Sequence, residues 1–243
     1  MEFRTSISKV IEDDVIIRGN KLSSLIQNNS FTDVAFLLLT NRFPNLTESK
    51  IFSAILTSII DHGMGTASSL TTRFVMSTGN SLNSAISAGI LALGEYHGGA
   101  IEKSMKQLLL IKNNNLNINN FVRENLENKK VIFGFGHKFH KYEDPRVIQI
   151  ILLCNKLKFK SDYIDISKNI EKELENIKGK KICLNIDGLI AAILLEMKFK
   201  PEIGNGIFII GRVPGLIAQA LEEKEKEKTI RRIEEGEIKY NPY

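Results

Sequence analysis

The sequence has few cysteines and no long apolar run, and both deficits restrict the class of protein it encodes. Cys154 and Cys183 are the only two cysteines; each lies in an apolar segment and neither belongs to a CxxC pair. Such residues are typical of buried thiols and do not indicate a zinc or redox site. The most apolar stretch, residues 51–60, is interrupted by polar side chains, and the N-terminus lacks an apolar signal core. We therefore expect a soluble, cytoplasmic protein without a membrane segment.

Charge of one sign is not concentrated either. The chain carries 33 Lys and Arg against 28 Asp and Glu, a formal net charge of +5, and the two signs are interleaved. Proteins that bind nucleic acid gather basic residues on one face, so we expect no nucleic-acid partner. The segment EEKEKEK, residues 222–228, predicts a solvated helix face on which Glu222 and Lys226 are four residues apart.

Several catalytic fingerprints are missing as well. The sequence has no GxSxG nucleophile elbow and no phosphate-binding loop, and GFGHKF lacks the third glycine of a dinucleotide fingerprint. His62, His97 and His137 have no HxxxH spacing and no cysteine cluster, so we expect no bound metal. These absences argue against the common hydrolase, nucleotide-binding and zinc classes.

What is present is mainly helical periodicity. Residues 22–40 place apolar side chains at mostly helical spacings around an NNS break, which predicts two helices. A helix over residues 81–93 carries small residues that would let another helix approach closely. Alternation over residues 182–186 could mean a strand that leads into a helix capped by Asp187, and residues 206–211 are similarly ambiguous.

Chemistry-bearing residues gather in four short motifs. Three of the four histidines lie in glycine-flanked turns, DHGMGTAS, GEYHGGA and GFGHKFHKYEDPR, and NIDG supplies an aspartate. Glycine lets the backbone approach a ligand, and imidazole titrates near neutral pH. The clustering therefore indicates a catalytic or binding site and not isolated core histidines.

These motifs, followed by GRVPGLIAQ, resemble the citrate synthase superfamily in order and approximate spacing over nearly the whole chain. Within the superfamily the chain is most similar to the short citryl-CoA lyase branch, which also resembles the C-terminal module of ATP-citrate lyase. The resemblance implies an all-α, citrate synthase-like fold in which both ambiguous segments are helical or irregular. It further implies a large helical domain, residues 1–96 plus 198–243, for dimerisation and substrate. A smaller inserted helical domain, residues 97–197, would bind coenzyme A, and the protein would be a homodimer or higher homo-oligomer.

The resemblance also assigns roles to individual residues. It implies that His97 stabilises the enol of the thioester, that His137 hydrogen-bonds the ketone of oxaloacetate, and that Asp187 is the catalytic carboxylate. Substrate carboxylates would be bound by His62, Arg146 and Arg212, because a guanidinium fork grips a carboxylate bidentately. Coenzyme A, a substrate thioester and not a permanently bound cofactor, would contact Lys138, Lys141, Lys180, Gly134 and Gly136.

The reaction accounts for these residue types, because a thioester is a weak carbon acid whose enolate needs stabilisation. A desolvated Asp187 can exchange the methyl proton while a neutral His97 donates a hydrogen bond to the thioester oxygen. In the cleavage direction, we hypothesise that His137 accepts the proton of the tertiary hydroxyl. Synthases of this family bring an arginine across the dimer near the C-terminus; for Arg231 and Arg232 a solvated helix face is the simpler interpretation.

The sequence leaves the direction of the reaction open. The compact N-terminal region, the short inserted domain and the ending IKYNPY resemble the lyase branch, which favours cleavage of citryl-CoA to acetyl-CoA and oxaloacetate. His97 resembles the synthases, so condensation by a citrate or methylcitrate synthase is an alternative. A noncatalytic coenzyme A-binding subunit of a citrate-cleaving assembly is another, and a citryl-CoA synthetase would be a partner.

Overall fold

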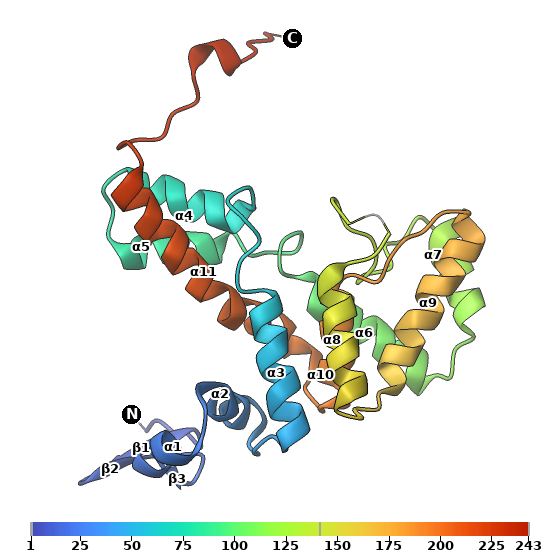
Figure 1. The fold of residues 1–243 in the computed structure, drawn as a ribbon, viewed down its shortest axis with the longest axis horizontal. Coiled ribbons are helices and arrows are strands. Elements are labelled where there is room, and N and C mark those ends of the chain that lie inside the picture. Colours follow the sequence, from blue (N-terminus) through green and yellow to red (C-terminus); the bar gives the residue numbers. More distant parts are fainter. Residues whose placement is uncertain (1, 141, 243) are drawn as a thin grey trace.

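The computed structural model describes residues 2–140 and 142–242 and is mainly helical (Figure 1). The predicted helical, citrate synthase-like class is confirmed, although the N-terminus adds a small sheet that was not predicted. The α-helices in the described residues are α1 (Leu22–Asn28), α2 (Phe31–Thr40), α3 (Leu46–Ser58), α4 (Ala67–Ser77), α5 (Leu82–Leu91), α6 (Ala100–Asn113), α7 (Ile118–Glu127), α8 (Pro145–Lys156), α9 (Asp162–Lys178), α10 (Ile186–Glu196) and α11 (Gly204–Lys226).

The N-terminal sheet is antiparallel and has the order β1 (Ser8–Ile11), β2 (Asp14–Ile17), β3 (Asn20–Lys21). Its strands have at most four residues each, too few for a clear alternation in the sequence. Arg18 fastens the sheet to the helices, because its guanidinium Nη2 donates to the carbonyl of Leu38 at 3.0 Å.

Local capping explains the first helices. The predicted break falls between α1 and α2, where Ser30 and Asp33 form a reciprocal capping box at the start of α2. Asn45 and Glu48 form a second capping box at the start of α3. Asn41 ends α2 in the left-handed conformation, a role that asparagine tolerates better than most residues.

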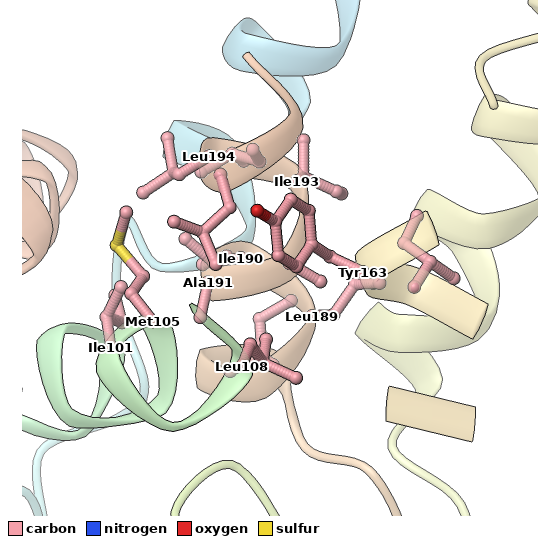
Figure 2. Close-up of a cluster of buried hydrophobic side chains, with 14 of the residues drawn as sticks. Ile101, Met105, Leu108, Tyr163, Leu189, Ile190, Ala191, Ile193 and Leu194 are labelled. Carbon is pink, nitrogen blue, oxygen red and sulfur yellow. The ribbon is translucent and has the colours of Figure 1, made fainter. Parts of the chain in front are cut away.

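Helix α10 is buried on all sides and forms the centre of the main core. Figure 2 shows side chains of α10 packed against Ile101, Met105 and Leu108 of α6 and against Tyr163 of α9. Each fully buried Leu or Ile contributes about 1.5–3 kcal/mol relative to an exposed one. The core therefore holds the N-terminus of α10 in a fixed place.

The sequence interpretation of residues 182–187 needs one correction. Residues 180–185 are irregular apart from an isolated bridge between Phe135 and Leu184, and α10 begins at Ile186. Asn185 caps α10 by accepting from the backbone N–H of Gly188 at 3.1 Å. The predicted cap, Asp187, is instead the second residue of the helix, so its carboxylate is not used to cap α10.

Helix α11 connects the main core to the α4 and α5 layer (Figure 1). By length and composition the segment Pro201–Lys226 could cross a bilayer, but 44% of its most apolar window is buried inside this protein. A Cβ added at Gly211 would lie 2.5 Å from Cγ1 of Ile59, so α11 passes close to the end of α3. This is the packing of a core helix, and residues 206–211 are helical as the family resemblance implied.

The small residues of α5 have the predicted packing role. A Cβ added at Gly89 would lie 1.9 Å from Oγ1 of Thr72 and 3.1 Å from the carbonyl oxygen of Ser68, both on α4. Ala85, four residues earlier on α5, is completely buried. The two helices can approach this closely only because glycine occupies the contact.

The division into two domains stays a prediction. The main cluster of buried side chains includes Phe36 and Phe52, which precede residue 97, together with Leu189 and Ile193, which follow it. A smaller cluster consists of Met76 of α4, Ala85 of α5 and Ala220 of the C-terminal half of α11.

The charged end of α11 is only partly a solvated face. Glu222 pairs with Lys226 at 3.4 Å as predicted, but Glu223 is 2% exposed. Its carboxylate accepts from Nε of Arg73 at 2.7 Å and from Nε of Arg231 at 2.5 Å. The prediction of a solvated helix face is therefore wrong for Glu223 and for Arg231. Arg231 lies beyond the end of α11, and its bond to Glu223 links the C-terminal segment to that helix. Arg232 is exposed.

Replacing Glu223 with glutamine should destabilise the protein. The substitution removes the closest carboxylate of the buried Arg73, whose Nη1 still donates to Gln219 and Glu222. Losing a hydrogen bond to a charged group costs about 1.5–3 kcal/mol. Urea denaturation measures the loss, with Glu225→Gln on the exposed face of α11 as the matched control. Equal stability of the two variants would contradict a stabilising role for the pair.

Candidate active site

A cavity of about 180 Å³ lies where the ends of several helices meet. The segment between α3 and α4, the turn before α6, the loop before α8, the start of α10 and the middle of α11 all contribute to its wall. All six residues predicted for catalysis and substrate binding line it: His62, His97, His137, Arg146, Asp187 and Arg212. The structure thus brings together residues that are up to 150 positions apart in the sequence, while their roles stay predictions.

His97 is held by a glycine-rich turn and by a serine that the sequence analysis missed. Gly98 has φ +88, and a Cβ there would lie 3.0 Å from Cδ1 of Phe208. The hydroxyl of Ser68, completely buried on α4, is 2.9 Å from Nε2 of His97. If this hydroxyl donates, the proton of the neutral imidazole is on Nδ1 and is available to a ligand. Ser68 could not be selected from the sequence, because nothing local distinguishes it from its neighbour Ser69.

The charge state of His97 follows from its surroundings. Burial lowers the pKa of His97, and the nearby Arg212 and His62 lower it further. The ring is therefore neutral at pH 7. The same holds for His62, whose pKa is lowered by burial and then by Arg146 and Arg212.

His137 has a defined tautomer. Its Nδ1 accepts from the backbone N–H groups of Phe139 at 3.1 Å and His140 at 3.0 Å. In the neutral ring the proton is then on Nε2, which makes Nε2 a donor. Burial lowers the pKa of His137, with His140 and Arg146 adding to the effect. This geometry fits a hydrogen bond from Nε2 to a ketone oxygen. It contradicts the hypothesis that His137 accepts a hydroxyl proton. To accept at Nε2 the neutral ring would need its proton on Nδ1, where it would face the N–H groups of Phe139 and His140.

Asp187 has one carboxyl oxygen, Oδ1, that is buried and has no partner in the described residues. Desolvation raises the pKa of Asp187 to about 6, with Arg146 and Arg212 opposing and Asp144 adding to the rise. A carboxyl group with this pKa can both give and take a proton near neutral pH.

Arg212 is a buried cation with spare hydrogen-bonding capacity. It is 2% exposed, its Nε donates to the carbonyl of Ile59 at 2.8 Å, and its Nη1 has no partner in the described residues. The guanidinium carbon lies 4.9 Å from the ring centroid of Phe208. A buried cation without a paired anion is costly, so this arrangement is typical of a site that binds an anionic ligand.

Arg146 is less free than the sequence suggested. Its Nε and Nη2 donate to the two oxygens of Asp144, at 3.0 and 2.8 Å, and Nη2 also lies 3.5 Å from Nε2 of His137. The Nε–Nη2 edge of the fork is therefore occupied, and the Nη1–Nη2 edge is the one that remains for a substrate carboxylate. Asp144 was overlooked, although its place in the DPR motif offered a signal.

The predicted contacts with coenzyme A are not gathered at the cavity. Lys138 and Lys180 are exposed and do not line it, and Lys141 lies outside the described residues. A Cβ at Gly134 would lie 2.6 Å from Cα of Gly188, so packing against α10 already requires glycine there. Gly136 has φ +79, and a Cβ there would lie 3.6 Å from Cγ2 of Ile182, an ordinary contact distance. These five coenzyme A contacts stay predictions.

Comparison with known proteins identifies the family. The family model of the citrate synthase C-terminal domain matches residues 46–233. The chain belongs to the citrate synthase family. Within the described residues, no group of three or more His, Cys, Asp or Glu side chains is placed to hold a metal ion.

Relatives in the family carry different names. The chain is 31% identical to a citrate synthase of Synechocystis over 214 residues, which cover 85% of the chain and 53% of that protein. It is 36% identical to a citrate synthase of Helicobacter pylori over 187 residues, covering 72% and 43%. With ATP-citrate synthase subunit 1 of Sordaria macrospora it shares 26% over 207 residues, covering 79% and 30%. The chain spans about half the length of the curated relatives it matches.

Solved structures of similar fold include a protein of nearly the same length. A citryl-CoA lyase from Hydrogenobacter thermophilus superposes with a TM-score of 0.94 at 39% identity, covering 98% of this chain and 94% of the lyase. An ATP citrate lyase from Methanothrix soehngenii, in complex with citrate and coenzyme A, has a TM-score of 0.91 at 23% identity, covering 99% and 42%. At that identity the second likeness shows a shared fold.

Replacing Arg212 with methionine should abolish binding of an anion in the cavity. Methionine has a similar length but no charge and no N–H donor, so the carboxylate of a ligand would lose its partner. Thermal unfolding with and without oxaloacetate measures the effect, because a ligand raises the melting temperature only if it binds the folded state. A variant that still shows the ligand-induced shift would exclude Arg212 from the anion site.

Proposed function

We propose that the chain is a citryl-CoA lyase, which cleaves citryl-CoA to acetyl-CoA and oxaloacetate through a thioester enolate. The observation that carries the chemistry is the carboxyl group of Asp187, whose buried Oδ1 has no partner in the described residues, in the same cavity as three neutral histidines and two arginines. The observation that favours the lyase is the near-complete mutual coverage with the citryl-CoA lyase structure.

Cleavage leaves a pair of electrons on the acetyl unit, and the cavity offers groups to stabilise it. As the carbon–carbon bond breaks, His97 donates a hydrogen bond to the thioester oxygen, on which the negative charge develops. One such donor in a desolvated site contributes about 3 kcal/mol to transition-state stability. Asp187 in its protonated form then gives its proton to the enolate carbon, which yields the methyl group of acetyl-CoA.

The other product, oxaloacetate, forms as the tertiary hydroxyl becomes a ketone. His137 donates from Nε2 to that oxygen, since its Nδ1 is engaged by backbone N–H groups. The hydroxyl proton passes to His62, which is neutral and whose ring centroid is 5.5 Å from that of His137. Arg146 and Arg212 hold the carboxylates of the departing oxaloacetate.

A citrate synthase is the second candidate, because relatives at 31–36% identity are named citrate synthase. One active site lowers the barrier in both directions, so condensation of acetyl-CoA, or of a longer acyl-CoA as in a methylcitrate synthase, uses the same groups. For the lyase, a citryl-CoA synthetase would supply the substrate. We propose a cytoplasmic homodimer or larger homo-oligomer in either case.

Two incubations of the purified protein distinguish the candidates. One contains citryl-CoA and the other contains acetyl-CoA with oxaloacetate, and both are followed by the appearance of free thiol and the amount of oxaloacetate. Oxaloacetate formed from citryl-CoA supports the lyase, whereas thiol released from the second mixture supports the synthase. If neither mixture reacts, catalysis is rejected and a noncatalytic coenzyme A-binding subunit remains as the candidate.

Replacing Asp187 with asparagine should reduce kcat by about 10²–10⁴-fold, the usual contribution of a positioned acid or base. Asparagine keeps the shape of the side chain but cannot transfer the proton. The matched control is Asp165→Asn on the exposed side of α9, which should keep wild-type activity. Undiminished cleavage by the Asp187 variant would refute the assignment.

The pH dependence of cleavage should have a defined sign at Asp187. The pKa of Asp187 is raised to about 6, so the protonated form that cleavage needs is lost as pH rises through that value. Rates with citryl-CoA should therefore fall as pH rises above about 6. Measuring kcat for citryl-CoA from pH 6 to 8.5 checks the sign; a rate that rises over this range would contradict the role of Asp187.

A further inference from the structure

Asp144 lies between two elements of the cavity that are far apart in the sequence. It is 1% exposed and is the N-cap residue of α8. Its Oδ1 accepts from the backbone N–H and from Nε of Arg146, both at 3.0 Å. Its Oδ2 accepts from Nη2 of Arg146 at 2.8 Å and from the backbone N–H of Ile186, 42 residues away, at 3.2 Å.

The sequence Asp-Pro-Arg suits this arrangement. Aspartate is a favoured N-cap, and Pro145 follows as the first helical residue, where no N–H is needed. Arg146 comes next, so both its backbone and its side chain can reach the cap. Burial alone would raise the pKa of Asp144, but the hydrogen bonds and charge of Arg146 outweigh burial and hold it below its ordinary value. The carboxylate is therefore ionised, as a strong ion pair requires.

The contacts of Asp144 restrain two groups at once. Two of the three guanidinium nitrogens of Arg146 are engaged, which fixes the plane of the fork and directs Nη2 to within 3.5 Å of Nε2 of His137. Ile186 is the first residue of α10 and directly precedes Asp187. One carboxylate thus joins the substrate arginine to the helix end that carries the proposed acid.

We propose that Asp144 is a positioning residue that fixes Arg146 relative to Asp187 and balances the charge of Arg146, so that Asp187 can hold a proton. This inference rests on the proposed function, since it concerns the same cavity. Asp144 does not line the cavity and acts through its two neighbours.

Charge balance at Asp187 gives the proposal a measurable sign. The charged groups that act on Asp187 are Arg146 at the start of α8, Arg212 on α11 and Asp144 itself; the three histidines of the cavity are neutral. Both arginines lower the pKa of Asp187, whereas Asp144 raises it. Removing the charge of Asp144 while Arg146 stays should therefore move the pKa of Asp187 below about 6.

The test replaces Asp144 with asparagine, which keeps the size of the side chain and one of its two acceptor oxygens but removes its charge. We expect kcat for citryl-CoA to fall about 10²-fold, because a small misplacement of catalytic groups has effects of this size. The fall of activity with rising pH should begin at a lower pH than in the wild type. Asp144→Glu, which keeps the charge, should restore the wild-type pH profile, and Asp165→Asn should change neither kcat nor the profile.

A second measurement needs no turnover. Carbon-13 NMR follows the titration of aspartate side chains, and the signal of Asp187 is identified by its loss in Asp187→Asn. It should titrate near pH 6 in the wild type and at lower pH in Asp144→Asn. If Asp144→Asn does not fold, Asp144→Ser, which also caps a helix and carries no charge, takes its place.

The outcomes separate this proposal from the proposed function. A lower kcat together with a shifted pH profile and a shifted titration supports the positioning role. Activity of Asp144→Asn within threefold of the wild type overturns the proposal. A lower kcat with an unchanged pH profile and an unchanged NMR titration also overturns it, because that result shows only a structural role. If the wild type turns over neither substrate mixture, the proposed function fails, and the NMR titration alone decides for or against Asp144.

Discussion

Backbone pairing between residues 134–136 and 183–185 is the contact on which the site depends. The N–H of Gly136 donates to the carbonyl of Cys183 at 2.7 Å, and the N–H of Asn185 donates to the carbonyl of Gly134 at 3.0 Å. The side chain of Asn185 adds a bond to the carbonyl of Gly136 at 2.8 Å. The pairing places His137, one residue after the first segment, in the same cavity as Asp187, two residues after the second.

This contact also explains why glycine is needed on both sides. Gly134 has φ +91, a conformation that side chains disfavour, and it lies directly against Gly188 in the first turn of α10. The core formed by α6, α9 and α10 holds that first turn in place (Figure 2). The core of α6, α9 and α10 and the contact between Gly134 and Gly188 therefore form one continuous unit. That unit carries the side chains of His137 and Asp187.

Buried charge is the cost of this arrangement. Arg212 and Asp187 both have a buried polar atom without a partner in the described residues, and each such atom lowers the stability of the empty protein. The charged pair at the other end of α11, Arg73 with Glu223, is fully satisfied. The contrast distinguishes an ion pair that supports the fold from charges in the cavity that have no partner in the described residues.

Much of the fold could be predicted from the sequence, and so could the six residues that come together at the cavity, while their roles stay predictions. The break between α1 and α2, the close packing of α5 and the six residues of the cavity were predicted from periodicity, small residues and ordered motifs. Short strands gave no periodic signal, so the N-terminal sheet was missed. Glu223 was misassigned because a run of charges looks the same whether or not one residue of it faces a buried arginine. Ser68 was missed because its contact with His97, 29 positions away, leaves no local signal. The DPR motif offered a signal for Asp144, but its bond to Ile186, 42 positions away, could not be read from the sequence.

The sequence by itself determined the helices, the glycine turns and which kinds of side chain stand at the site, because propensity, capping and backbone freedom act over a few neighbouring residues. Only the tertiary structure decided the tautomer of His137, the raised pKa of Asp187 and the engagement of Arg146 by Asp144. Each of these depends on burial and on the position of a charge or an N–H group in space, and neither quantity is defined until the chain has folded.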